Sequence, residues 1–310
     1  MSIATRESYG KALIELGKEN ENVVVLDGDL SKSTKTAGFA SEYPDRFINA
    51  GIAEQNLMGM AAGLATVGKV PFASTFAVFA SGRAFEIIRN SICYTNLNVN
   101  IAATHAGITV GEDGGSHQSI EDIALMRSLP NMTVIVPADD IEAKQAVKEA
   151  VNIDGPVYLR LGRLGVPAIF DENYKFIPGK GTVIKEGNDI TIVGTGLMVS
   201  KCLEAANLLE NEGINARVIN ISTIKPIDEE IIIEAAKETG RIITVEEHSV
   251  IGGLGSAVSE VVSTNYPVKV VRIGIEDQFG ESGNPYDLLE KYGLSMENII
   301  SKVKGLLQSL

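Results

Sequence analysis

The stretch NAGIAEQNLMGMAAGL, residues 49–64, places a single acid, Glu54, among glycines, alanines and large apolar side chains. Leu57, Met60 and Leu64 recur at helical spacing, which predicts a helix that begins near Glu54. In the first turn of a helix, the positive end of the dipole stabilises a carboxylate. Apolar surroundings also make a carboxyl group hold its proton more tightly, which suits general acid–base chemistry. Glu54 is therefore either a helix-start acid that faces water or a functional acid.

Short β-rich runs flank this stretch and recur along the first half of the chain. They lie at 23–27, 70–75, 99–104, 132–137 and 156–161, with helical patterns between them. After Leu164 the periodicity fades into Pro, Gly, Asp and Lys, which indicates a linker. A second alternation follows, with strands at 190–195, 215–221, 241–247 and 268–273 and helices near 199–211, 229–239 and 255–264.

Strands that alternate with helices form βαβ units, whose parallel sheets are covered on both faces. We therefore predict an α/β fold of two domains, each a mostly parallel sheet covered by helices. The first domain spans residues 1–170, the linker 171–188 and the second domain 189–310.

Three local patterns have structural explanations. Gly194-Thr195-Gly196 follows a strand and precedes a helix, but Val199 stands where a dinucleotide fingerprint needs its third glycine, so we predict a tight turn. Gly252-Gly253-Leu254-Gly255 is interpreted as a helix entry rather than a phosphate cradle. Asp139, followed by Glu142, predicts a capped helix start.

Composition narrows the classes of partner. The chain has 310 residues, 27 basic and 40 acidic, with a net charge of −13 and no basic stripe, which argues against nucleic-acid binding. Cys93 and Cys202 lie far apart without further ligand residues, as expected for buried free thiols in a reducing compartment. No run has the form of a signal peptide or a membrane span, so a cytoplasmic protein that binds no membrane is predicted.

Two of the three histidines occur in one glycine-rich loop, THAGITVGEDGGSHQ at residues 104–118. The loop follows a predicted strand, and the strand ends of open α/β sheets are where ligands bind. His105, Asp113 and His117 are thus candidate site residues, although a mobile polar loop is the alternative. Zinc fits poorly, because the two histidines are twelve residues apart with no third ligand nearby.

Two further predicted strands end at or just before residues that are candidates for a binding site. Phe76 and Phe79 lie three residues apart and share one helical face, which in most proteins belongs to the core. YLRLGR, at residues 158–163, puts Arg160 at the end of a predicted strand, where a guanidinium can make a bidentate contact with an anion.

Several of these motifs resemble the C-terminal half of the transketolase family of thiamine-diphosphate enzymes. GIAEQ is similar to the family's pyrimidine-binding domain, and GEDGGSHQ resembles the signature GEDGPTHQ, with Gly115 for Pro and Ser116 for Thr. KPID at 225–228 and VEEHSVIGGLGSAV at 245–258 resemble the family's C-terminal domain, whose role there is largely dimer contact. The resemblance implies that Glu54 hydrogen-bonds the aminopyrimidine of thiamine diphosphate and so activates the cofactor.

The same resemblance implies roles for the other candidates. Phe76 and Phe79 would surround the aminopyrimidine, with Gly82 in place of a third aromatic and Arg83 or a partner chain supplying the missing wall. In VVVLDGDLSKS, residues 23–33, Asp29 would lie near the cofactor, although an Asp-Gly turn is its structural explanation. For the substrate, Ser33, His105 and Arg160 would meet at the pocket mouth and hold a sugar phosphate. Asp113 would hold a hydroxyl, and His117 the hydroxyl next to the reacting carbonyl, where an imidazole can also move a proton.

A complete transketolase also has an N-terminal domain that holds Mg²⁺ and the diphosphate, and its motifs do not occur here. The resemblance therefore implies the smaller subunit of a split transketolase of pentose phosphate metabolism, a heterotetramer active only with an N-terminal subunit and self-associating through both of its own domains. Three alternatives remain: the β subunit of a 2-oxoacid dehydrogenase, a deoxyxylulose-phosphate-synthase-like enzyme, and a non-catalytic partner that stabilises a thiamine enzyme.

Overall fold

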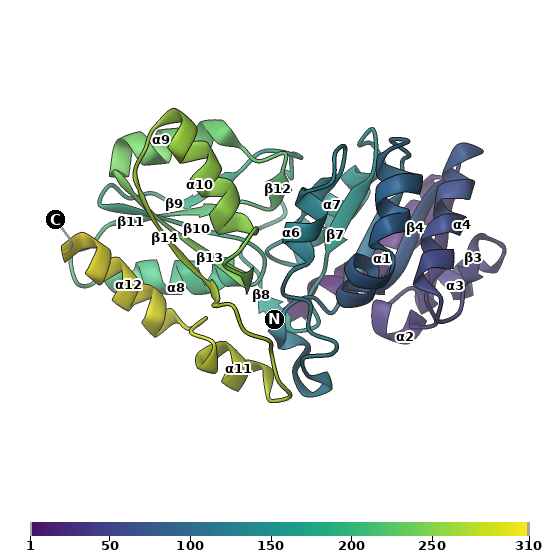
Figure 1. The fold of residues 1–310 in the computed structure, drawn as a ribbon, viewed down its shortest axis with the longest axis horizontal. Helices are drawn as coiled ribbons and strands as arrows, with labels where there is room; N and C mark the ends of the chain where they lie inside the picture. Colours follow the sequence, from purple (N-terminus) through teal and green to yellow (C-terminus); the bar gives the residue numbers. More distant parts are fainter. Residues whose placement is uncertain (1, 309–310) are drawn as a thin grey trace.

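The computed structural model describes residues 2–308 and shows two α/β lobes side by side (Figure 1). The first lobe contains a seven-stranded sheet in the order β12, β6, β7, β5, β4, β2, β3. Its strands are β12 (Thr223–Lys225), β6 (Thr133–Ile135), β7 (Val157–Arg160), β5 (Asn100–Thr104), β4 (Val70–Phe76), β2 (Val23–Asp27) and β3 (Phe47–Asn49). All neighbours pair in parallel except β12 with β6.

The second lobe is built on a five-stranded sheet in the order β14, β13, β10, β11, β9. Its strands are β14 (Lys269–Ile275), β13 (Arg241–Ser249), β10 (Ile190–Gly194), β11 (Ala216–Asn220) and β9 (Thr182–Lys185), of which only β9 pairs antiparallel. A separate antiparallel pair joins β1 (Ser2–Ala4) to β8 (Gly165–Pro167).

Helices pack against both sheets (Figure 1). Those up to residue 150 are α1 (Thr5–Glu19), α2 (Ser31–Thr34), α3 (Ala37–Glu42), η1 (Pro44–Arg46), α4 (Glu54–Thr66), η2 (Phe79–Arg83), α5 (Phe85–Ile87), η3 (Ile88–Cys93), η4 (Ile108–Asp113), α6 (Asp122–Arg127) and α7 (Asp140–Ala150). The later ones are α8 (Met198–Glu210), α9 (Glu229–Thr239), α10 (Leu254–Asn265), α11 (Pro285–Lys291) and α12 (Met296–Gln308).

The fold class is confirmed, and its physical basis is burial on both faces of the central strands. Every residue of β2, β5 and β10 is buried, as expected for parallel strands that helices cover on each side. Strand β9 lies inside the segment that we predicted as linker, and it extends the edge of the second sheet.

The local predictions about helix starts and cysteines are also confirmed. The Asp139 side chain accepts the Glu142 N–H at 2.8 Å and caps α7. Helix α10 begins at Leu254, and its first N–H groups donate to the buried carboxylate of Glu246, so the glycine-rich segment is a helix entry. Both cysteines are buried free thiols.

The two lobes are joined by more than the connecting segment. Strand β12 comes from the second half of the chain but pairs with β6 of the first sheet. Asn220, at the end of β11, donates to the buried carboxylate of Glu142 on α7 at 2.8 Å. Within residues 2–308, no helix combines the length and apolar character needed to cross a bilayer.

Candidate active site

An aromatic wall forms where β4 ends and η2 begins. The Phe76 ring is stacked on His105, with ring centroids 3.8 Å apart, and also on Phe79, at 5.8 Å. His117 approaches Phe79 edge-on at 5.4 Å. The structure therefore brings both histidines of the 104–118 loop against the two phenylalanines, so the glycine-rich loop and the β4 end form one surface.

Glu54 is the first residue of α4, and its side chain is only 5% exposed. The Arg83 guanidinium lies 3.2 Å from the Glu54 Oε1 atom and also 4.3 Å from the ring centroid of Phe79. An open hollow of about 500 Å³ adjoins this pair, lined by Ala53, Glu54, Gln55, Asn56 and Arg83. Glu54 is thus a buried acid at the wall of a hollow, linked through Arg83 to the Phe79 ring, rather than a helix-start acid in water.

Arg6 contacts His105 beside this wall, and the charge of Arg163 also acts on both side chains. We call Arg6, His105 and Arg163 the basic cluster. Arg6 donates to the Ser33 carbonyl at 2.9 Å, and the same nitrogen lies 3.2 Å from His105 Nε2. Since an arginine only donates, Nε2 accepts, which leaves Nδ1 to donate to the Thr104 hydroxyl at 3.0 Å. Ser33 and His105 are therefore linked through Arg6.

The electrostatics of the basic cluster favour an anion. Burial, and then the charges of Arg6 and Arg163, lower the pKa of His105 to about 3. Arg6 has its own pKa lowered, chiefly by burial, and its buried Nε has no hydrogen-bond partner among the described residues. Converging positive charge with an unsatisfied buried donor is a suitable environment for a phosphate dianion.

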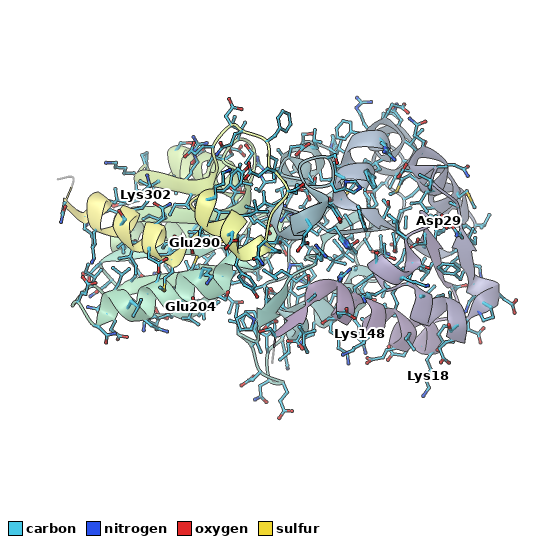
Figure 2. The ribbon with its side chains drawn as sticks, turned by 90° about the horizontal axis from the view of Figure 1, so that it is seen from below. Lys18, Asp29, Lys148, Glu204, Glu290 and Lys302 are labelled. Carbon is cyan, nitrogen blue, oxygen red and sulfur yellow. The ribbon has the colours of Figure 1, made fainter. Side chains whose placement is uncertain are left out.

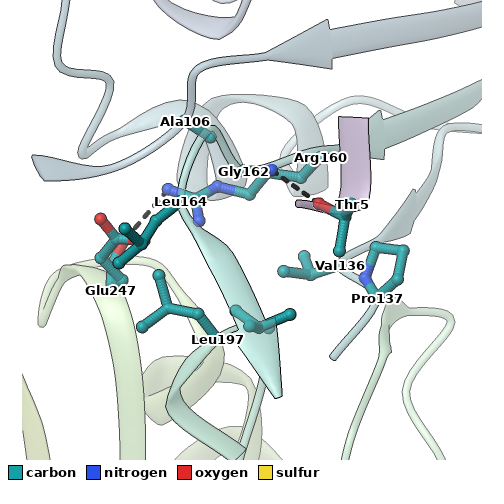
Figure 3. A pocket seen from close by; sticks show the side chains of 11 residues that line it. Thr5, Ala106, Val136, Pro137, Arg160, Gly162, Leu164, Leu197 and Glu247 are labelled. Carbon is teal, nitrogen blue, oxygen red and sulfur yellow. Dashed lines mark hydrogen bonds between the residues drawn. The ribbon is translucent and has the colours of Figure 1, made fainter. Parts of the chain in front are cut away.

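Arg160 does not belong to this cluster, and the prediction that it lies at the pocket mouth with Ser33 and His105 is wrong. Its side chain is 6% exposed and points into the boundary between the lobes (Figure 3). The Nε atom pairs with Asp122 at 2.8 Å, while Nη2 donates to the carbonyls of Ser119 and Glu247. These buried partners use most of its donors, so Arg160 is a structural residue here.

Arg163, three residues further on, is the arginine of this segment whose charge lowers the pKa of His105 and of Arg6, after burial as the main cause. It lies beyond the end of β7, where the loop can turn toward His105, and its guanidinium donates to Val110 O and to Glu112 at 2.9 Å. The sequence signal was present, because YLRLGR contains a second arginine. Arg6 carried no comparable signal, since it is 99 residues from His105 in the chain.

The C-terminal lobe holds the loop that carries the histidines. Thr109 N–H donates to the Glu247 carboxylate at 2.7 Å, and Gln118 donates to the Glu281 carbonyl at 2.9 Å. Burial raises the pKa of Glu247 to about 7, although Arg160 opposes that shift. The position of the loop therefore depends on contacts from both lobes.

Asp113 and Asp29 lie on the surface. Asp113 is the exposed last residue of η4, near the start of the turn that leads to His117. Asp29 has a left-handed backbone, with φ of 66°, and accepts from Asn49 at 2.9 Å. Figure 2 shows Asp29 in the first lobe, distant from Lys302 on α12. Their roles stay predictions, as does the role of Arg83. Among residues 2–308, no three His, Cys, Asp or Glu side chains are grouped as metal ligands.

Two family models match the chain and together cover most of it. Residues 1–167 match the model described as transketolase, pyrimidine binding domain, and residues 179–299 match transketolase, C-terminal domain. A protein described as a putative transketolase C-terminal section from Methanocaldococcus jannaschii is 54% identical over 301 residues, which are 96% of this chain and 94% of that protein.

Longer relatives and solved structures agree. The Homo sapiens transketolase is 40% identical over 309 residues, covering 98% of this chain but only 49% of that protein. A solved structure described as a split gene transketolase, inactive beta4 tetramer, is 63% identical, with a TM-score of 0.93 and 98% of each chain covered. The chain thus spans about half of the longer relatives and nearly the full length of the shorter ones.

Proposed function

Because this chain belongs to the transketolase family and matches its C-terminal half, we propose that it is the C-terminal subunit of a two-chain transketolase that depends on thiamine diphosphate. The reaction transfers a two-carbon ketol unit between phosphorylated sugars. One observation carries the proposal: Glu54, Phe79 and His117 lie on a surface that continues through Phe76 into the basic cluster. A cofactor site and an anion site adjoin there.

The residues around Glu54 fit an aminopyrimidine. The buried carboxylate borders an open hollow. The space beside Gly82 is also open, because a Cβ there would lie more than 4 Å from every atom of residues 2–308 other than its chain neighbours and the nearby backbone of its own helix. When bound, thiamine diphosphate supplies the carbon nucleophile that accepts the ketol unit. Glu54 would hold a proton against a ring nitrogen, and Phe76 and Phe79 would cover the apolar ring. We assign the diphosphate and Mg²⁺ to the N-terminal subunit, as the family resemblance implies.

The basic cluster would bind the substrate phosphate, with Ser33 beside it. Its side chains belong to three separate segments, so the site exists only in the folded chain. Binding at this remote group would orient the sugar and contribute to catalysis at the other end. His117, edge-on to Phe79, would hold and move a proton at the hydroxyl next to the carbonyl, and Asp113 would accept from a further hydroxyl.

Support for the two-chain assembly comes from the relatives. One is described as a transketolase C-terminal section, and the split-gene structure is described as an inactive beta4 tetramer. We infer that this chain likewise associates with copies of itself and needs an N-terminal subunit for activity. Among the alternatives, the basic cluster disfavours a 2-oxoacid dehydrogenase subunit, because 2-oxoacids carry no phosphate. The buried Glu54 beside both histidines disfavours a non-catalytic partner.

A donor panel tests the proposal. The chain is co-expressed with an N-terminal transketolase subunit from its own organism and assayed with phosphorylated ketoses, unphosphorylated ketoses and pyruvate. We expect ketol transfer from phosphorylated ketoses, dependent on both chains and lost in Glu54→Gln. Preference for pyruvate would instead support the dehydrogenase reading, and full activity of Glu54→Gln would remove the catalytic role of the acid.

A further inference from the structure

Arg83 makes the two contacts that the proposed aminopyrimidine site would offer its ligand. Its guanidinium lies 3.2 and 3.4 Å from the two oxygens of Glu54, and 4.3 Å from the ring centroid of Phe79. Both the carboxylate and this ring are therefore covered by one side chain of the same protein.

The chemistry of a guanidinium explains why it can serve as a stand-in. It is planar, its N–C–N unit directs N–H donors toward a carboxylate, and its face stacks on aromatic rings. An aminopyrimidine is also planar, carries the same N–C–N unit, and would present a ring nitrogen to Glu54 and a face to Phe79. One carboxylate and one ring face cannot serve both groups in the same place.

The local structure holds the Arg83 backbone in place and leaves its side chain free to move. Arg83 follows Phe79 by four residues in the wide turn of η2, so the two side chains share a face. Gln55 donates to the Arg83 carbonyl at 3.3 Å, which holds the backbone against α4. The side chain is nevertheless 54% exposed, and the neighbouring Gly82 borders open space into which it can turn.

We infer that Arg83 is an internal plug: it occupies the aminopyrimidine position in the cofactor-free chain, keeps the buried charge of Glu54 paired, and is displaced when the cofactor enters. This inference rests on the proposed function, because it takes thiamine diphosphate as the ligand. It differs from the other role open to Arg83, a third wall that remains against the bound ring. A wall strengthens cofactor binding, whereas a plug competes with it.

The opposite signs of these two effects define the test. A partly exposed ion pair and a cation–π contact together reduce the apparent affinity of a competing ligand by about tenfold. Calorimetric titration of the two-chain complex with thiamine diphosphate and Mg²⁺ should therefore give about tenfold tighter binding for Arg83→Ala than for the wild type. Arg83→Gln, which keeps a planar polar group without the charge, should bind about threefold tighter and serves if Arg83→Ala does not fold.

Arg89→Ala is the matched control, because Arg89 is an exposed arginine of the following segment whose side chain contacts Asn90. It should bind like the wild type. Equal or weaker binding by the folded Arg83 variants would overturn the plug while leaving the proposed function intact. If no complex binds thiamine diphosphate, the wild type included, both the plug and the proposed function are overturned.

Discussion

Two arginines three residues apart, Arg160 and Arg163, should respond to substitution in opposite ways. The Arg160 side chain is 6% exposed and its partner Asp122 is completely buried. The Arg160 Nε atom lies 2.8 Å from Asp122 Oδ2. Removing one member of a buried ion pair leaves an uncompensated charge, at a cost of about 3–5 kcal/mol. Arg160→Ala should therefore lower the free energy of unfolding by about that amount, a large fraction of the stability of an ordinary protein.

Arg163→Ala should affect the substrate instead. The Arg163 side chain is 35% exposed and its partner Glu112 is 66% exposed, so solvent screens their ion pair and it contributes little to stability. If Arg163 binds the phosphate of a ketose, its loss removes a charge-assisted hydrogen bond of about 1.5–3 kcal/mol. The KM for that ketose should then rise roughly 10- to 100-fold, with little change for an unphosphorylated analogue.

Urea denaturation of the purified chain and steady-state kinetics of the two-chain complex measure both effects. The reasoning would be refuted by the reverse result, in which Arg160→Ala keeps its stability and loses phosphate selectivity while Arg163→Ala keeps both. An equal loss for phosphorylated and unphosphorylated sugars in Arg163→Ala would remove this arginine from the phosphate site.

Three further outcomes are expected. Glu54→Gln should slow deuterium exchange at C2 of bound thiamine diphosphate by about 100-fold or more with the fold intact, and an unchanged exchange rate would contradict its role. Burial raises the pKa of Glu247 from its ordinary value of 4.5 to about 7, so its stabilising contribution is complete below pH 4.5 and is lost as pH rises through 7. Glu247→Gln should thus gain stability relative to the wild type between pH 5 and pH 8, by about 1–3 kcal/mol in urea denaturation, and a pH-independent difference would contradict this. Burial, and then the positive charges of Arg6 and Arg163, lower the pKa of His105 to about 3, so inorganic phosphate bound beside them should raise that pKa in NMR titrations of the ring, and no change would argue against an anion site.

The fold was predictable because the chain's strongest patterns are local. Runs such as VVVLD and ITIVG are buried on both sides, and their spacing with helices determines a parallel sheet. Four strands that were missed, β1, β3, β8 and β12, have only three residues each, and helices α11 and α12 lie beyond the last helix that we predicted. Strand β12 exists because distant segments meet, since residues of the second half pair with β6. No periodicity within so short a segment indicates its partner.

Candidate site residues were predictable where they lie in a sequence motif. They were not predictable where segments distant in the chain meet only in the folded structure. Glu54, Phe76, Phe79 and both loop histidines lie in segments with recognisable motifs, and the structure places them along one surface. Arg6 reaches His105 only through tertiary packing. Arg160 was assigned from its position at a strand end, which does not determine whether a side chain turns toward the hollow or toward the other lobe.

The central claim is that this chain provides the pyrimidine half of a cofactor site that a separate N-terminal chain completes. Calorimetric titration with thiamine diphosphate and Mg²⁺ tests it most directly, first with this chain alone and then with the co-expressed pair. We expect weak binding to the isolated chain, because Glu54 and the aromatic wall contact only one end of the cofactor, and at least about 100-fold tighter binding to the pair. Equally tight binding to the isolated chain would contradict the split site.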